Sequence, residues 1–119
     1  MPASDLLASS VALKLFAVLR FVDARRPTDD EVADHLNWMF SLEEEGKLFL
    51  SGPMVKTGEG APSGLSILRA GSEEEVKEIM ADDPFVKAGL IHWTSHQWTA
   101  YEGSLSVRIR LSSSTVETW

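Results

Sequence analysis

The 119 residues, 44% hydrophobic and 24% charged, have an ordinary globular composition, long enough for one domain with little room for a second. The formal net charge of −7 argues against nucleic acid or an anionic membrane surface as the main partner, because both select clustered Lys and Arg. The absence of Cys excludes disulfide scaffolds, thiolate catalysis and Cys-ligated metal sites.

The first predicted element is a strand over residues 13–22, in which apolar side chains alternate. We expect one face to be partly covered and the other to be the buried face, which carries Leu13, Leu15, Ala17, Leu19 and Phe21. A helix is predicted to follow, because Thr28 and Glu31 form a capping box. Gly46 provides a left-handed exit at the end of this helix.

The middle of the chain predicts two short strands on either side of a long loop. The strands cover residues 47–51 and 64–70, where apolar side chains gather. The loop covers residues 56–63, which are rich in Gly, Pro and Ser.

The C-terminal third predicts one helix and two more strands. A capping box that begins at Ser72 starts the helix, and Pro84 is expected to close it, because a proline ring blocks helical continuation. Residues 90–101, rich in Trp, Thr and Ile, predict a long strand, and residues 105–111 alternate strictly. Residues 112–119 are expected to form a tail.

The predicted order is β-α-β-β-α-β with an extra C-terminal strand, which is typical of the α+β, ferredoxin-like split βαβ arrangement. In this arrangement both helices cover one face of an antiparallel sheet. The chain has no helix left for the other face, so we expect a homodimer or a higher homo-oligomer that covers it. The aromatic residues that make a bare face unfavourable are Phe16, Trp93 and Trp98.

We predict that residues 1–119 form a single domain, in which residues 1–12 are an N-terminal lead and residues 103–119 an extra strand and tail. No basic segment precedes the first apolar stretch, and no stretch reaches the length of a membrane helix. We therefore expect a cytoplasmic protein that contacts neither membrane nor nucleic acid.

Several short motifs occur in a fixed order along most of the chain. They are DHL at residues 34–36, EGKL at 45–48, SGP at 51–53, ADDPF at 81–85 and AG at 88–89. Together these motifs resemble the YciI-like (YCII-related) family over residues 13–101. The resemblance implies a dimeric α+β barrel with a His–Asp site, which falls on His35 and Asp83 in this chain. The N-terminal lead and the added C-terminal strand depart from the family pattern.

The residues alone leave a purely structural explanation open for each member of this pair. His35 lies at the edge of the first helix's apolar stripe, where a His is more often packed, and an Asp before Pro commonly starts a turn. Only the family resemblance brings His35 and Asp83 together. An imidazole titrates near pH ~6.5, and a neighbouring carboxylate fixes its tautomer, so a paired His35 suits general acid–base catalysis. Ser51, at a strand end, is a candidate donor to an oxyanion.

Three further residues are candidates for substrate binding. His96 and Trp98 lie on the same face of one predicted strand, where a flat aromatic wall suits a planar ring, and Pro53 follows the candidate donor. His92 and His96 are four residues apart on a strand, roughly 13 Å, which is too far for one ion. We therefore predict no metal site.

The family resemblance also indicates a reaction. Among members with an assigned reaction, the chain is similar to those that remove HCl from a chlorinated hydroxyhydroquinone in aromatic degradation. We predict a cofactor-free lyase or isomerase that acts on a cyclic enol or phenol through His35 and Asp83. The alternatives are a muconolactone-type isomerase and a small-molecule-binding or regulatory barrel without catalysis.

Overall fold

The computed structural model describes residues 3–4, 13–110 and 115–118. The chain forms two compact units: residues 14–99 make one, and residues 1–13 with residues 100–119 make the other. Most of the predicted lead over residues 1–12 lies outside the described residues. The single domain over the whole chain stays a prediction.

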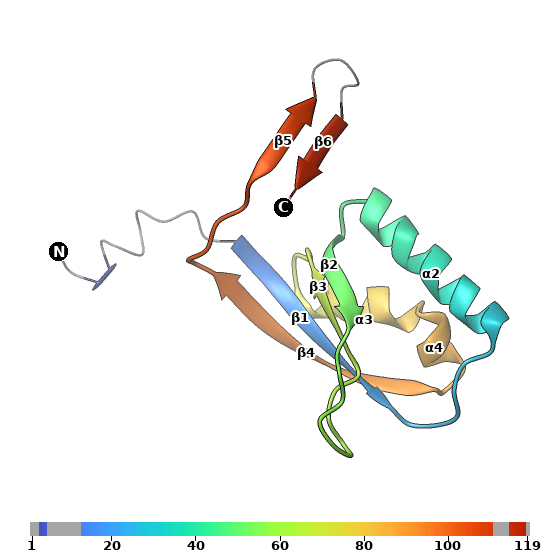
Figure 1. The fold of residues 1–119 in the computed structure, drawn as a ribbon. Coiled ribbons are helices and arrows are strands. Elements are labelled where there is room, and N and C mark those ends of the chain that lie inside the picture. The colour runs from blue at the N-terminus through green and yellow to red at the C-terminus, as the bar shows by residue number, and fades with distance from the viewer. Residues whose placement is uncertain (1–2, 5–12, 111–114, 119) are drawn as a thin grey trace. The chain divides into compact units, whose positions relative to one another are not determined.

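The larger unit is built on a four-stranded sheet, shown in Figure 1. Its strands are β1 (Leu13–Val22), β2 (Leu48–Pro53), β3 (Gly64–Leu68) and β4 (Ile91–Ala100). The strand order is β2-β3-β1-β4, β3 pairs antiparallel with both neighbours, and β4 runs opposite to β1. This is the predicted α+β arrangement with β3 between the two strands of the first βαβ unit.

The helices of this unit are α2 (Asp29–Glu44), α3 (Glu73–Ala81) and the single turn α4 (Pro84–Lys87). The capping box of α2 is confirmed: Glu31 N–H donates to Thr28 Oγ1 at 3.2 Å, and Thr28 N–H donates to Glu31 Oε1 at 2.9 Å. Gly46 takes the expected left-handed conformation after α2, with φ of 75°. Among the described residues, no helix is long and apolar enough to cross a membrane.

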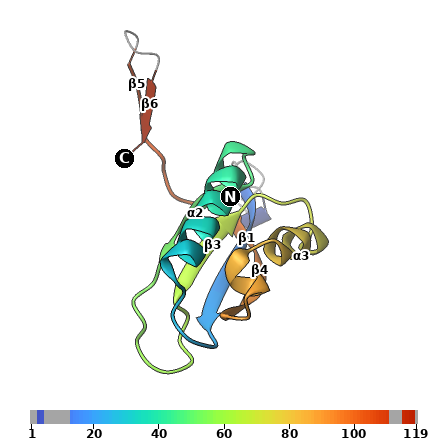
Figure 2. The same cartoon turned by 90° about the vertical axis from the view of Figure 1, so that its right-hand side faces the viewer.

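The helices pack on one face of the sheet, as Figure 2 shows. The core between them joins side chains of β1, β3, α2 and α3. Its buried members are Phe16, Val18, Leu68, Met39, Leu42, Val76, Ile79 and Met80, with Trp93 packed against them.

This packing corrects the prediction for β1. The face under the helices is the one with Phe16 and Val18, whereas the set predicted to be the buried face, from Leu15 to Phe21, points the other way. Within that set Leu15 is nevertheless buried, with 3% of its surface exposed. Both faces of β1 are apolar, so alternation alone did not identify the covered one. Phe16, expected on the uncovered face, lies in the core with 2% of its surface exposed.

The second helical segment also differs from the prediction. Helix α3 ends at Ala81, and Pro84 does not simply close it but starts α4. Asp83 is the N-cap of this turn, and its carboxylate accepts the backbone N–H of Phe85 at 3.0 Å. Asp at the N-cap and Pro at the first helical position are both favoured, because the first N–H groups of a helix need outside acceptors.

The predicted extra C-terminal strand is present, but it pairs with a second strand that was not predicted. Strand β5 (Val107–Arg110) pairs antiparallel with β6 (Thr115–Thr118) in a separate two-stranded sheet. The predicted tail of residues 112–119 therefore contains a strand, which the absence of clear alternation concealed. Leu111, the predicted end of the extra strand, lies outside the described residues.

Candidate active site

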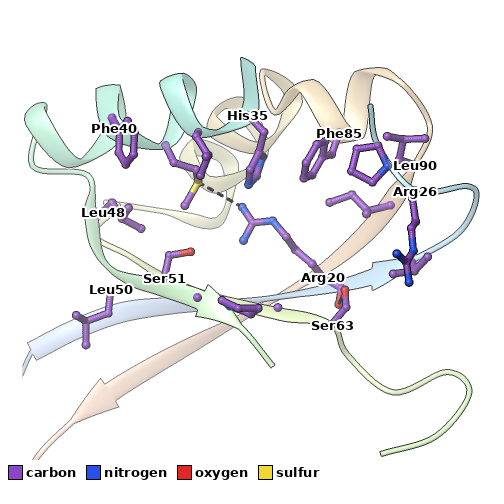
Figure 3. A pocket seen from close by; sticks show the side chains of 18 of the residues that line it. Arg20, Arg26, His35, Phe40, Leu48, Leu50, Ser51, Ser63, Phe85 and Leu90 are labelled. Carbon is purple, nitrogen blue, oxygen red and sulfur yellow. Dashed lines mark hydrogen bonds between the residues drawn. The ribbon is translucent and has the colours of Figure 1, made fainter. Parts of the chain in front are cut away.

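A cavity of about 630 Å³ opens beside α2 on the helical side of the sheet. His35 on α2, Arg20 on β1, Ser51 on β2 and Phe85 on α4 all line it, as Figure 3 shows. Apolar side chains of α2, β2 and the start of β4 complete its wall. An apolar cavity with a few convergent polar groups is the usual form of a small-molecule site.

His35 is held in this wall by two contacts. Its Nδ1 lies 2.8 Å from Asp83 Oδ1, and its ring stacks on Phe85 with centroids 4.0 Å apart and planes 6° from parallel. A carboxylate only accepts hydrogen bonds, so the proton of this bond belongs to Nδ1, and Nε2 is the nitrogen left for a ligand. The His35 side chain is 14% exposed, which leaves it accessible from the cavity.

Asp83 lies behind His35 and has no exposed surface. A buried carboxylate is costly unless partners compensate its lost hydration. Besides His35 and the backbone N–H of Phe85, Asp83 has Arg20, whose Nε lies 3.5 Å from Oδ2 as an ion pair. The two charged groups and the imidazole therefore form one connected cluster.

Arg20 brings a buried positive charge to the cavity wall. Its Nη1 donates to Ser66 Oγ, and its Nη2 lies 3.8 Å from Met39 Sδ and 3.9 Å from Met80 Sδ. Burial lowers the pKa of the Arg20 guanidinium, while the charge of Asp83 acts in the opposite direction. An Arg guanidinium stays protonated in proteins, so Arg20 remains a cation that can only donate.

Two serines on neighbouring strands continue this cluster. Ser51 on β2 and Ser66 on β3 are register partners, and their Oγ atoms lie 2.8 Å apart. Ser66 is fully buried, whereas Ser51 is exposed and lines the cavity. The hydroxyl of Ser51 therefore connects the buried cluster to the cavity.

Comparisons with known proteins give the family of the chain. A family model described as the YCII-related domain matches residues 15–95. The chain belongs to this family. A search of curated proteins finds no match.

Among solved structures, the YCII-related chain is similar to 5-chloro-2-hydroxyhydroquinone dehydrochlorinase (TftG) from Burkholderia phenoliruptrix AC1100. That structure is a complex with 2,5-dihydroxybenzoquinone. The two chains are 29% identical with a TM-score of 0.55, over 71% of this chain and 92% of the other. The predicted family and its α+β fold are thus confirmed.

The structure brings together only some of the residues singled out in the sequence. His35 and Asp83 are in contact, and Ser51 and Pro53 line the same cavity. His96 and Trp98 do not line it. Trp93 packs against the core on the helical side, and His96 and Trp98 lie three and five positions further along the strand, so both point to the opposite face.

Sequence reasoning missed Arg20 and Ser66. Each is a buried polar side chain in a strand of mainly apolar neighbours. The signal that could have identified Arg20 is its position on the same face of β1 as Phe16 and Val18. No group of three His, Asp or Glu side chains that suits a metal ion occurs within the part of the chain that the structure describes.

Proposed function

We propose that this YCII-related protein is a cytoplasmic acid–base enzyme of aromatic-compound degradation. It acts as a lyase that tautomerises a chlorinated hydroxyhydroquinone-like ring and eliminates HCl from it without a cofactor. The observation that carries the proposal is the 2.8 Å contact between His35 Nδ1 and Asp83 Oδ1 in the cavity wall. The similarity to a dehydrochlorinase supports the choice of reaction.

The chemistry requires two proton shifts and the loss of chloride. An aryl chloride does not eliminate directly, so a ring hydroxyl first loses its proton while the chlorine-bearing carbon gains one, which gives a keto tautomer. A second hydroxyl, conjugated to that carbon through one ring double bond, then loses its proton. Its electrons form a C=O bond, the double bond moves, the C–Cl bond breaks, and the products are a hydroxyquinone, chloride and one net proton.

The residues of the site fit these steps. His35 takes and returns the proton through Nε2, and Asp83 fixes the tautomer and stabilises the imidazolium. Ser51 donates to the oxygen on which negative charge develops. Pro53 and the apolar side chains of the cavity hold the ring.

We further propose that the protein is a homodimer or a higher homo-oligomer. The sheet face opposite the helices has no cover from a helix of this unit, and Trp98 on that face is 48% exposed. A second copy would bury this apolar surface.

The decisive experiment offers the purified protein a panel of chlorinated hydroxyhydroquinones and muconolactones. Chloride release and quinone absorbance should rise together, in equal amounts, with the chlorinated substrates. We expect His35→Ala to lower turnover about 10²–10⁴-fold, because it removes the general acid–base group.

The chain offers a matched control at His92. Its Nδ1 lies 2.6 Å from Asp23 Oδ1 and its ring stacks on Phe21, so it is also an aromatic-stacked His–Asp pair, but it does not line the cavity. His92→Ala should retain turnover. Equal loss in both variants, or none in His35→Ala, would contradict the mechanism. Binding of the substrates without turnover would favour the non-catalytic alternative.

A further inference from the structure

We infer that Arg20 and Ser66 are positioning residues that aim the Ser51 hydroxyl into the cavity as a hydrogen-bond donor, so that the site selects ring ligands in their deprotonated, phenolate or enolate form. This inference deepens the proposed function: it assigns a ligand class to the same cavity. It depends on the direction of two hydrogen bonds, from Arg20 to Ser66 and from Ser66 to Ser51, which the chemistry of the groups determines.

The chain of hydrogen bonds begins at Arg20. A guanidinium has five N–H donors and no acceptor, so Nη1 donates to Ser66 Oγ and never the reverse. Ser66 has one hydroxyl proton of its own to place, and its side chain is fully buried. Within the part of the chain that the structure describes, its hydroxyl partner is Ser51 Oγ at 2.8 Å. Ser66 therefore donates to Ser51.

The opposite direction is unfavourable. If Ser51 donated to Ser66, the Ser66 oxygen would accept two hydrogen bonds and its own proton would remain buried without an acceptor. An unpaired buried donor loses its hydration with no compensating bond. Because Ser51 is exposed, its proton has no such constraint and can meet water or a ligand in the cavity. The arrangement thus favours a Ser51 that accepts from the protein and donates to the ligand.

The charged side chains around the cavity come mostly in pairs. Among the residues that the structure describes, its charged lining side chains are Arg20, Arg25, Arg26 and Glu43. Arg25 already pairs with Glu31 at 2.7 Å, outside the lining. Arg20 is likewise paired with Asp83, 3.5 Å from its Nε. The charges of the lining therefore largely cancel, and the preference for an anion rests on the Ser51 donor.

A coloured phenol tests the inference without any turnover. Free 4-nitrophenol absorbs differently as phenol and as phenolate, so its spectrum in complex with the protein reports the pKa of the bound ring. We expect wild-type protein to bind the phenolate about tenfold or more tightly than the phenol, which lowers the bound pKa by about one unit or more. Ser66→Ala should remove most of this preference, and Ser66→Thr, which keeps a hydroxyl, should restore it.

Ser63 provides the matched control. Its hydroxyl also belongs to the cavity wall, but it donates to the Arg20 carbonyl oxygen at 3.3 Å and has no part in the chain from Arg20 to Ser51. Ser63→Ala should keep the preference for phenolate. A merely structural role of Ser66 would lower the melting temperature and leave the bound pKa unchanged, which would overturn the inference.

Failure of this inference and failure of the proposed function give different results. A lowered bound pKa that depends on Ser66, in a protein with no chloride release, supports the donor chain and rejects the dehydrochlorination. Chloride release with an unshifted nitrophenol pKa rejects the donor chain and keeps the reaction. Equal affinity of wild-type protein for phenol and phenolate also rejects the donor chain.

Discussion

Replacing Asp83 by Asn removes the negative charge at the centre of the site while keeping nearly the same shape. The carboxylate has no exposed surface, so it does not touch a ligand, but it contacts His35, Arg20 and the backbone N–H of Phe85. An amide oxygen can still cap α4, whereas it offers no charge to the guanidinium. The variant therefore tests both the stability of the charge cluster and the role of His35.

The magnitude follows from the burial of Arg20, which is 7% exposed. Breaking a buried ion pair by removing one partner costs about 3–5 kcal/mol, because the other charge stays buried and uncompensated. A domain of this size melts about 4–6 °C lower per kcal/mol, so we expect Asp83→Asn to lower the Tm by at least about 12 °C. Turnover should fall through kcat with little change in KM, because tautomer control and imidazolium stabilisation are lost while the cavity lining is unchanged.

A double variant separates charge from shape. Arg20→Met combined with Asp83→Asn removes both charges and places a thioether between Met39 and Met80. Because coupled neighbours are not additive, the double variant should be more stable than Asp83→Asn alone by at least about 1 kcal/mol. Urea unfolding of wild type, both single variants and the double variant gives the coupling energy.

Two results would refute this reasoning. An Asp83→Asn variant with the Tm of the wild type would mean that Arg20 does not depend on the carboxylate. Purely additive free energies of unfolding in the four proteins would mean that the two charges are not coupled. Chloride release measured on the folded fraction at low temperature keeps the catalytic result independent of the loss of stability.

The remaining predictions concern acid stability and assembly. The hydrogen bond from Arg25, with that from the Thr28 backbone, lowers the pKa of Glu31 from 4.5 to about 2, so the stability it contributes is full above pH 4.5 and is lost as the pH falls toward about 2. Glu31→Gln should therefore flatten the dependence of Tm on pH in that window, and an unchanged slope would contradict the assignment. Light scattering should give a mass of at least twice 13.1 kDa at micromolar concentration, and deletion of residues 103–119 should lower the oligomeric order. A monomer, or an unchanged elution volume after the deletion, would count against these two expectations.

Local features of the fold were predictable because they depend on a few adjacent residues. The capping bond of Glu31 to Thr28 and the left-handed Gly46 appear where the sequence placed them. At α3 only half of the predicted capping box forms: Ser72 accepts from Glu75 N–H, but the Glu75 side chain accepts from Gly71 N–H instead of Ser72 N–H. The turn α4 had a local signal too: Asp83 followed by Pro84 is an N-cap followed by a first helical position, but it was interpreted as the end of a helix.

The site itself depends on packing that no local pattern contains. His35 and Asp83 are 48 residues apart, and their contact requires α4 to lie beside the middle of α2. The covered face of β1 was predicted wrongly because both of its faces are apolar, and that error hid Arg20, which projects from the covered face. Only the family resemblance supplied the pairing of the His and the Asp.

The loop between β2 and β3 divides the polar groups of the site into two sets along the chain. Those before the loop are Arg20, His35 and Ser51, and those after it are Ser66 and Asp83. Each βαβ half of the fold thus contains acids, bases or donors whose partners lie in the other half. Under the proposed function, turnover therefore depends on the docking of the two halves as well as on chemistry, and we expect a fragment that folds as one half alone to be inert.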